Sequence, residues 1–101
     1  MANFVKVCKT AEVPPGTGKT LDVNGKPVAL FNVDDNFYAL DNTCLHRGGP
    51  LGEGELDGKV VTCPWHGWRY DVTSGTHEMN PSIIVEKYEV KIEGDDVLMA
   101  V

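Results

Sequence analysis

Residues 44–66 read CLHRGGPLGEGELDGKVVTCPWH, and the rest of the chain is expected to fold around this stretch. It begins with the pair Cys44 and His46 and ends with the pair Cys63 and His66, with sixteen residues between His46 and Cys63. Each pair offers one thiolate and one imidazole, and clusters of Cys and His at such spacing are typical of metal sites. The stretch therefore predicts a metal centre with four protein ligands, two from each of two loops.

Two kinds of centre can use these four ligands. A single zinc ion binds two thiolates and two imidazoles, but structural zinc sites usually pair Cys with Cys and His with His. A two-iron, two-sulfide cluster fits the mixed pairing better, because the two Cys would hold one iron and the two His the other. Such a cluster is neutral when oxidised, so it accepts an electron at a higher potential than a cluster with four thiolates.

The flanking sequence predicts short β-strands at regular spacing. Segments rich in β-branched and aromatic residues alternate with turns that contain Gly, Asn and Asp, and no helical periodicity stands out. The expected strands are 3–8, 19–23, 28–33, 37–40, 59–62, 68–72, a run within 83–92, and 97–101. Between the ligand pairs, five glycines within residues 48–58 predict a loop. The pattern indicates an all-β sandwich or small barrel.

Two short motifs within the expected strands need separate interpretation. Asn24-Gly25 predicts a hairpin turn, which Lys26-Pro27 would lengthen. Residues 16–20, GTGKT, resemble the end of a phosphate-binding P-loop, but Val13 stands where that motif needs its first Gly. A strand and a turn, rather than a helix, are expected to follow, so residues 16–20 are interpreted as a loop and not as a nucleotide site.

Length and composition predict a single domain over residues 1–101. No apolar run approaches the ~18 residues of a membrane helix, and the first residues lack the apolar core of a signal peptide. A cytoplasmic location is therefore expected. Three cysteines, two of them in the ligand motif, argue against a disulfide scaffold.

The chain carries nine basic and fifteen acidic residues, a net charge of −6. The acidic residues are scattered along the sequence rather than gathered into a tail. This charge disfavours contacts with a phosphate backbone, which argues against a nucleic-acid partner. It favours an encounter with a basic surface on another protein, although it serves solubility equally well.

The two ligand segments, 44–46 and 63–68, resemble the Rieske ferredoxin family in its small soluble form. The loop 48–51, Tyr70-Asp71 and the final segment 88–90 also fit, so the resemblance extends over nearly the whole chain. It implies the Rieske iron–sulfur fold, an antiparallel sandwich with two cluster-binding loops at one end. It also implies one [2Fe-2S] cluster per subunit, with the cluster-binding region at about residues 42–82.

By the same resemblance, the cluster ligands are Cys44, His46, Cys63 and His66. The two histidines would bind through Nδ1 and keep their other ring nitrogens near solvent, where the electron leaves. Cys8 is outside this set and is expected to be a small buried hydrophobic residue.

The sequence departs from Rieske proteins of respiratory complexes at three positions. Those proteins carry an extra Cys in each ligand loop, joined by a disulfide, and here the matching positions hold Gly49 and Trp65. They also place a Ser two residues after the second His, where this chain has Trp68, whereas their tyrosine is matched by Tyr70. Fewer hydroxyl donors to the cluster sulfurs predict a low reduction potential within the Rieske range.

Several residues near the motif have two readings each. Trp65 and Trp68 either cover the cluster and form a docking face or simply pack in the core. Gly48 and Gly49 either bring backbone N–H groups to the sulfides or are plain turn residues.

Three further residues near the motif are also open. Pro81 resembles the proline of a third cluster-covering loop but also fits an ordinary turn. Arg47 either aids docking and tunes the potential or is an ordinary surface residue. His77, in a polar turn, is expected to be solvated.

The chain has no dinucleotide-binding fingerprint and no room for a catalytic domain, so an electron carrier rather than an enzyme is expected. The resemblance implies that this carrier takes electrons from an NAD(P)H-dependent flavoprotein reductase. It would pass them singly to an oxygenase, typically one that hydroxylates aromatic rings. A monomer without nucleic-acid or membrane partners is expected.

Two alternatives stay open. One is the small subunit of a nitrite reductase, a related fold whose members often lack the ligands. The other is a structural zinc module. Neighbouring genes discriminate the first alternative, and the colour of the purified protein discriminates the second.

Overall fold

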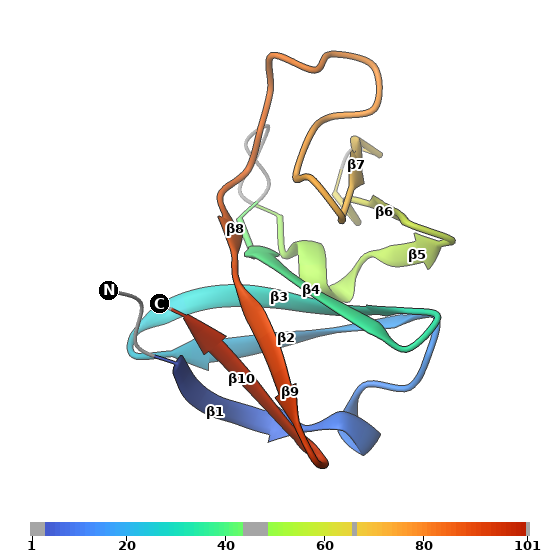
Figure 1. The fold of residues 1–101 in the computed structure, drawn as a ribbon. Coiled ribbons are helices and arrows are strands. Elements are labelled where there is room, and N and C mark those ends of the chain that lie inside the picture. Colours follow the sequence, from blue (N-terminus) through green and yellow to red (C-terminus); the bar gives the residue numbers. More distant parts are fainter. Residues whose placement is uncertain (1–3, 44–48, 66, 101) are drawn as a thin grey trace.

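The computed structural model describes residues 4–43, 49–65 and 67–100 (Figure 1). The described part of the chain consists of short β-strands with two single-turn 3₁₀ helices. The elements are β1 (Phe4–Lys9), η1 (Thr10–Glu12), β2 (Thr17–Val23), β3 (Lys26–Val33), β4 (Asn36–Asp41), η2 (Leu51–Glu53), β5 (Glu55–Asp57), β6 (Val60–Thr62), β7 (Arg69–Asp71), β8 (Lys87–Tyr88), β9 (Val90–Glu93) and β10 (Asp96–Ala100).

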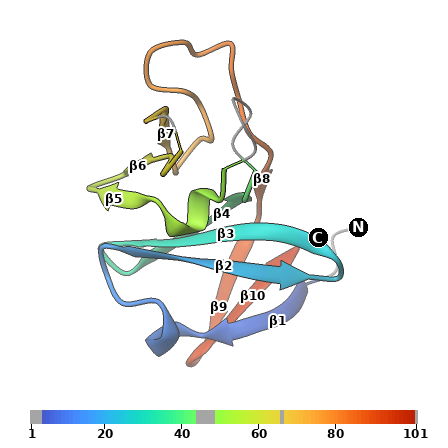
Figure 2. The ribbon, with the colours of Figure 1, turned by 180° about the vertical axis from the view of Figure 1, so that it is seen from behind.

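The strands of the described residues form three antiparallel sheets. Their orders are β1-β10-β9, β2-β3-β4-β8 and β5-β6-β7. The four-stranded sheet lies between the other two, with β1, β9 and β10 against one face and the small β5–β7 sheet beyond the other (Figures 1 and 2). This arrangement confirms the predicted all-β fold with antiparallel strands.

The central strand β3 explains why the sequence has a continuous apolar run at residues 28–31. Successive side chains of a strand point to opposite faces, so a strand buried on both faces has no polar alternation. Val28 and Leu30 face the lower core, which lies between the four-stranded sheet and the β1-β10-β9 sheet. Ala29 and Phe31 face the upper core, beneath the small sheet. One strand thereby joins the two halves of the molecule.

Each core draws its residues from several elements. The lower core contains Cys8, Val13, Val23, Val28, Leu30, Ala39, Tyr88, Val97 and Met99. The upper core contains Ala29, Phe31, Leu40, Leu51, Val61, Cys63, Tyr70, Val72 and Val85. Cys8 is 7% exposed, which confirms its prediction as a buried small hydrophobic residue. Cys63 belongs to the upper core, so the packing that folds the small sheet also positions this predicted ligand.

The β2–β3 hairpin is tighter than the sequence predicts. Asn24 and Gly25 have φ values of 53° and 82°, and Val23 pairs with Lys26. Two central residues with positive φ form the turn whose twist matches that of the flanking strands. Lys26 and Pro27 therefore begin β3, and the expectation that they lengthen the connection is wrong.

One other segment differs from expectation, and the strand expected within residues 83–92 is confirmed over part of that run. Strand β5 forms where only a loop is predicted, because Leu56 packs against the upper core while Glu55 and Asp57 pair with β6. In the run 83–92, regular strand begins only at Lys87, and Ile84 makes a single bridge and is 56% exposed. Packing against neighbouring strands, rather than local propensity, decides both segments.

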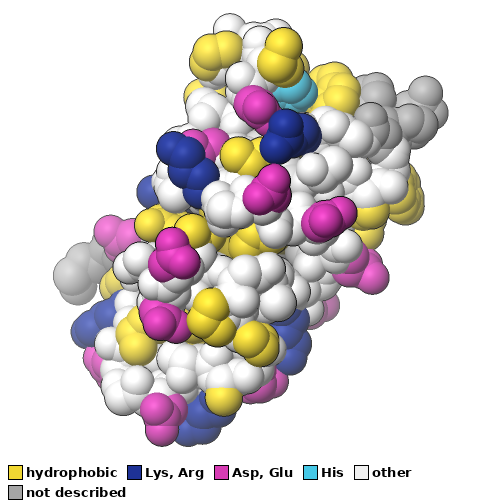
Figure 3. Space-filling view, turned by 90° about the vertical axis from the view of Figure 1, so that its right-hand side faces the viewer, with side chains coloured by type: hydrophobic (Ala, Val, Ile, Leu, Met, Phe, Trp, Pro, Cys, Tyr) yellow, Lys and Arg dark blue, Asp and Glu magenta, His cyan; other side chains and the backbone are white. Residues whose placement is uncertain are grey.

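Three further features concern nucleotide binding, membrane insertion and surface charge. Residues 17–20 lie inside β2, so no helix follows the P-loop-like segment. In the described part of the chain, no helix is long and apolar enough to cross a membrane. Figure 3 shows acidic and basic side chains interspersed over one face of the molecule, in keeping with the scattered charges of the sequence.

Candidate metal centre

Of the four predicted ligands, the structure describes Cys63. Cys44, His46 and His66 lie outside the described residues, as do Arg47 and Gly48. Within the described ranges no three His, Cys, Asp or Glu side chains gather closely enough to hold a metal ion. The four-ligand set therefore stays a prediction, and the geometry around Cys63 tests whether the site suits it.

Cys63 stands at the start of the turn that joins β6 to β7. Its backbone N–H donates to the carbonyl oxygen of Trp68 at 2.7 Å, and its own carbonyl accepts from the N–H of Gly67 at 3.1 Å. The flanking residues Thr62 and Arg69 pair across the hairpin. Gly67 has φ of 76°, a conformation that glycine adopts without strain. Cys63 thus lies in a tight turn whose base is closed by these hydrogen bonds.

Asn42 closes the base of the first ligand loop. Its side-chain Oδ1 accepts a hydrogen bond from the N–H of Gly52 at 2.7 Å, and the residue is 6% exposed. Its carbonyl oxygen accepts from the N–H of Leu51 at 2.8 Å. A bridge between Thr43 and Pro50 completes the closure. The sequence pattern does not single out Asn42, although an Asn just before a ligand loop is a residue type that bonds nearby backbone.

Gly49 brings the two ligand loops into contact. A Cβ atom built on Gly49 would lie 2.9 Å from the Sγ of Cys63 and 3.1 Å from the Cγ of Trp65. Real Cβ atoms do not approach so closely, so only glycine fits. Positions 49 and 65, which the sequence matches to the disulfide of respiratory proteins, do lie side by side.

The setting of Cys63 suits a sulfur-ligated cluster. The residue is 2% exposed, and the Gly49 backbone forms a cradle beside its sulfur that a side chain would fill. A thiolate is the soft ligand that iron–sulfur clusters and zinc both use. The residues present therefore fit a metal–sulfur centre.

The two tryptophans separate into different environments. Trp65 is 54% exposed, whereas Trp68 is half-buried, with its ring centroid 6.5 Å from that of the buried Tyr70. Trp65 thus belongs to the surface beside the candidate centre, and Trp68 belongs to the packing beneath it.

His77 is half-buried and its Nε2 atom is buried, so the side chain is less solvated than the sequence predicts. Its ring makes edge contacts with Trp68 at 4.6 Å and with Tyr70 at 5.4 Å between centroids. The reason is a backbone bridge between Tyr70 and His77, which carries the apparent turn back against β7.

Charged side chains of β7 make hydrogen bonds and ion pairs with the segments next to it. Burial acts to raise the pKa of Asp71, but hydrogen bonds from Thr73 and the charge of Lys59 outweigh it, so the pKa lies below its usual value. The Thr73 hydroxyl donates to Asp71 at 2.6 Å. Arg69 pairs with Glu78 at 3.2 Å, which ties β7 to the following loop.

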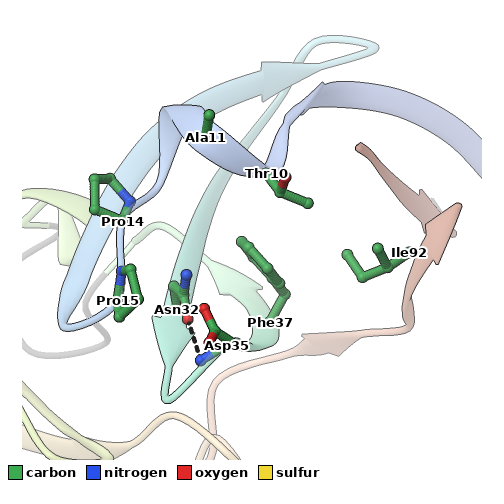
Figure 4. A pocket seen from close by; sticks show the side chains of 8 residues that line it. All are labelled: Thr10, Ala11, Pro14, Pro15, Asn32, Asp35, Phe37 and Ile92. Carbon is green, nitrogen blue, oxygen red and sulfur yellow. Dashed lines mark hydrogen bonds between the residues drawn. The ribbon is translucent and has the colours of Figure 1, made fainter. Parts of the chain in front are cut away.

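A separate hollow of about 440 Å³ lies beside η1 (Figure 4). The η1 segment is in the half of the molecule away from β6 and β7 (Figure 1). Asn32, which lines the hollow, donates to the carbonyl of Val13 at 2.7 Å and accepts from the N–H of Asp35 at 2.8 Å. The residues that line this hollow are Thr10, Ala11, Pro14, Pro15, Asn32, Asp35, Phe37 and Ile92. None of them is Cys or His, so this hollow is no part of the metal centre.

Comparison with known proteins gives consistent matches over almost the whole chain. A family profile described as the Rieske [2Fe-2S] domain matches residues 3–89. The biphenyl dioxygenase ferredoxin subunit of Pseudomonas sp. (strain KKS102) is 40% identical over 98 residues, which cover 95% of this chain and 90% of that protein. Ferredoxin CarAc of Metapseudomonas resinovorans is 35% identical over 99 residues, which cover 96% and 92%.

Solved structures agree with these matches. A complex of reduced oxygenase and oxidized ferredoxin in carbazole 1,9a-dioxygenase contains a chain that matches with a TM-score of 0.87 and 34% identity, covering 96% of this chain and 92% of that one. A putative nitrite reductase NADPH (small subunit) protein matches with a TM-score of 0.84 and 21% identity, covering 98% and 99%. At 21% identity, the likeness to the nitrite reductase subunit shows a shared fold and does not indicate a shared function.

Proposed function

The chain belongs to the Rieske [2Fe-2S] domain family, and on that premise we propose that it is a ferredoxin that carries single electrons to a ring-hydroxylating oxygenase. Its relatives are named as ferredoxin components of dioxygenase systems, which are electron carriers rather than catalytic subunits. The observation that carries the proposal is the buried sulfur of Cys63 in the cradle of Gly49.

We assign the [2Fe-2S] cluster to Cys44, His46, Cys63 and His66. When bound, the cluster takes up and releases one electron at a time. The chain's own residues fix where this happens. The hydrogen-bonded hairpin of β6 and β7 presents Cys63, and Asn42 bonds the backbone N–H of Gly52, beyond the segment that carries the other pair. Both loops meet at Gly49, so one centre can use ligands from both.

We propose two redox partners. The related chain in the carbazole 1,9a-dioxygenase complex is a ferredoxin bound to its oxygenase, which supports an oxygenase as the acceptor here. The donor is an NAD(P)H-dependent flavoprotein reductase, because the sequence has no nicotinamide site of its own. The net charge of −6 suits basic contact surfaces on both partners. We further propose a single domain over residues 1–101 that acts in the cytoplasm as a monomer.

Metal and sulfide analysis tests the cofactor assignment. Protein expressed with adequate iron is expected to be red-brown and to contain two irons and two acid-labile sulfides per chain. The Cys63→Ser variant should lose the cluster, while Cys8→Ser should keep it, because Cys8 lies in the lower core. One zinc per chain without iron, in protein made with iron in excess, would establish the zinc alternative instead.

Electron delivery tests the physiological role. Candidate flavoprotein reductases with NADH or NADPH are mixed with the protein, and cluster reduction is followed by bleaching of its visible absorption. The reduced protein is then mixed with the oxygenase encoded beside it, and aromatic product is quantified. Genes for a nitrite reductase large subunit beside this one, and nitrite-dependent reoxidation, would favour the nitrite reductase alternative.

A further inference from the structure

His77 uses its two ring nitrogens very differently. Nδ1 accepts hydrogen bonds from the backbone N–H groups of Met79 at 3.0 Å and Asn80 at 3.2 Å. Nε2 is buried and has no hydrogen-bond partner among the described residues. A neutral imidazole whose Nδ1 accepts carries its proton on Nε2, so a buried donor is left unpaired. Such groups are rare and costly in folded proteins, which indicates that the ring is held in place for another reason.

One reason is the loop of residues 78–82. Met79 is 83% exposed, and Asn80, Pro81 and Ser82 are exposed as well, so apolar burial contributes little to fixing this loop. Two backbone N–H groups of the loop instead converge on the imidazole of His77. The Asn80 side chain then accepts from the N–H of Ser82 at 3.1 Å. The course of the loop therefore depends on an acceptor at the position of Nδ1.

The second reason is Trp68. The His77 ring meets the Trp68 indole edge-on, with 4.6 Å between centroids and an interplanar angle of 90°. The Trp68 carbonyl in turn accepts the backbone N–H of Cys63. Beside this contact is a hollow of about 300 Å³, which residues of both the turn and the loop line: Gly67, Trp68, Arg69, His77, Glu78 and Met79. His77 thus stands where the loop and the ligand turn meet.

We propose that His77 is a positioning residue for the electron-carrying centre. Its Nδ1 sets the course of the 78–82 loop, and its ring holds Trp68 against the turn that carries Cys63 and His66. Together these two contacts limit the access of water to the turn beside Cys63. The inference rests on the proposed function, since it concerns a cluster held by that turn.

Two variants separate the two contacts. His77→Asn keeps an acceptor at the position of Nδ1, because Asn Oδ1 has the same reach, but it removes the ring. His77→Phe keeps an aromatic ring against Trp68 but removes the acceptor. Met79→Ala serves as the control, because it changes the exposed side chain of the loop and neither contact.

Each variant has its own expected signature. In His77→Phe, hydrogen exchange of the peptide that spans residues 77–83 should accelerate roughly tenfold, as the loss of two hydrogen bonds permits. In His77→Asn that peptide should stay protected. The midpoint potential of His77→Asn should instead rise, because water reaching the cluster stabilises the negatively charged reduced state. Both variants should lose their visible absorption to a chelator several-fold faster than the wild type and Met79→Ala.

Wild-type exchange in His77→Phe would overturn the loop assignment, and a wild-type potential in His77→Asn would overturn the role of the ring. Circular dichroism checks that each variant is folded before either result is interpreted. Failure of the proposed function is distinguishable, because the wild-type protein itself would then lack a [2Fe-2S] cluster or fail to deliver electrons.

Discussion

The backbone of Gly49 lies against the sulfur of Cys63, so closely that a Cβ atom on residue 49 would come within 2.9 Å of Sγ. The same Cβ would meet the Trp65 ring at 3.1 Å. The two ligand loops are therefore in contact through a position that tolerates no side chain. In respiratory Rieske proteins a disulfide joins the matching positions, and here direct packing of Gly49 against Trp65 occupies that place.

Gly49→Ala should lower the cluster content of the purified protein. The added methyl group must displace either the Cys63 sulfur or the Trp65 ring, and overpacking of this kind costs about 1–3 kcal/mol. Iron and acid-labile sulfide per chain measure the effect. Gly94→Ala is a matched control, because Gly94 has φ of 62° with open space around it. It should lose stability through backbone strain and keep its cluster. Equal cluster content in both variants would contradict the role given to Gly49.

Asn42→Ala should destabilise the first ligand loop. The substitution leaves the buried N–H of Gly52 without its acceptor, which costs about 1–3 kcal/mol. Urea unfolding measures the loss, and faster release of the cluster should accompany it. Asn36→Ala is the control, since Asn36 is exposed and its side-chain hydrogen bond to the carbonyl of Asp34 is 3.5 Å long. If Asn42→Ala unfolds at the same urea concentration as the control, the hydrogen bond between Asn42 and Gly52 does not stabilise the loop.

The sequence is informative about chemistry and strand content, for physical reasons. The Cys and His residues must occur at a spacing that one centre can use, and β-branched runs between turn residues mark strands through local propensity. These signals predict the metal centre and the all-β fold. The family resemblance, and not these local signals, matches residues 49 and 65 to the disulfide positions of respiratory proteins. The contact between Gly49 and Trp65 is a finding of the structure.

What the sequence hides depends on strand pairing. His77 follows a Ser-Gly-Thr turn and looks solvated, yet its bridge to Tyr70 carries it against β7. Asn42 looks like an ordinary turn residue until Gly52, ten positions later, returns to its side chain. Strand β5 forms because Leu56 packs against the upper core. Each of these depends on contacts between residues distant in sequence, which local patterns do not encode.

Asp71→Asn should destabilise the protein at neutral pH and lose that effect in acid. The folded-state pKa of Asp71 is lowered by its hydrogen bonds to Thr73 and the charge of Lys59, which outweigh its burial. A carboxylate with a lowered pKa stabilises the fold above its unfolded pKa of about 3.9, and this contribution disappears as pH falls through the folded pKa. Thermal unfolding is followed by circular dichroism between pH 7 and about pH 2. It measures the gap, which is the difference in unfolding temperature between the wild type and Asp71→Asn.

The control for this pH dependence is Asp57→Asn, at an exposed position in β5. Its unfolding temperature should follow that of the wild type across the same pH range. A gap between wild type and Asp71→Asn that persists unchanged below pH 3 would mean that the charge of Asp71 is not the source of its effect.

The reduction potential should fall in the low part of the Rieske range, which extends from about −150 to +300 mV. Trp68 stands where respiratory proteins place a serine, and an indole offers no hydroxyl to the cluster sulfurs. The half-buried Trp68 is already packed against His77 and Tyr70. Protein-film voltammetry at pH 7 gives the value directly, and a strongly positive midpoint would contradict this reasoning.

Trp65→Ala should weaken electron delivery to the oxygenase without emptying the site. Trp65 is 54% exposed and lies beside Gly49, at the junction of the two ligand loops. Exposed Trp residues at interface centres commonly contribute about 2 kcal/mol or more to binding, so the apparent KM for the ferredoxin should rise on the order of tenfold or more.

Ile92→Ala is the matched control, because Ile92 is 42% exposed and belongs to β9. The β1-β10-β9 sheet and the strands β6 and β7 lie on opposite sides of the four-stranded sheet (Figure 1). Ile92→Ala removes exposed apolar surface as Trp65→Ala does, but from the opposite half of the molecule. Oxygenase turnover at varied ferredoxin concentration should therefore show a raised KM for Trp65→Ala alone, with iron content equal in all three proteins. A raised KM for both variants would mean that the oxygenase contacts the molecule far from the cluster end, and no change for either would remove Trp65 from the docking surface.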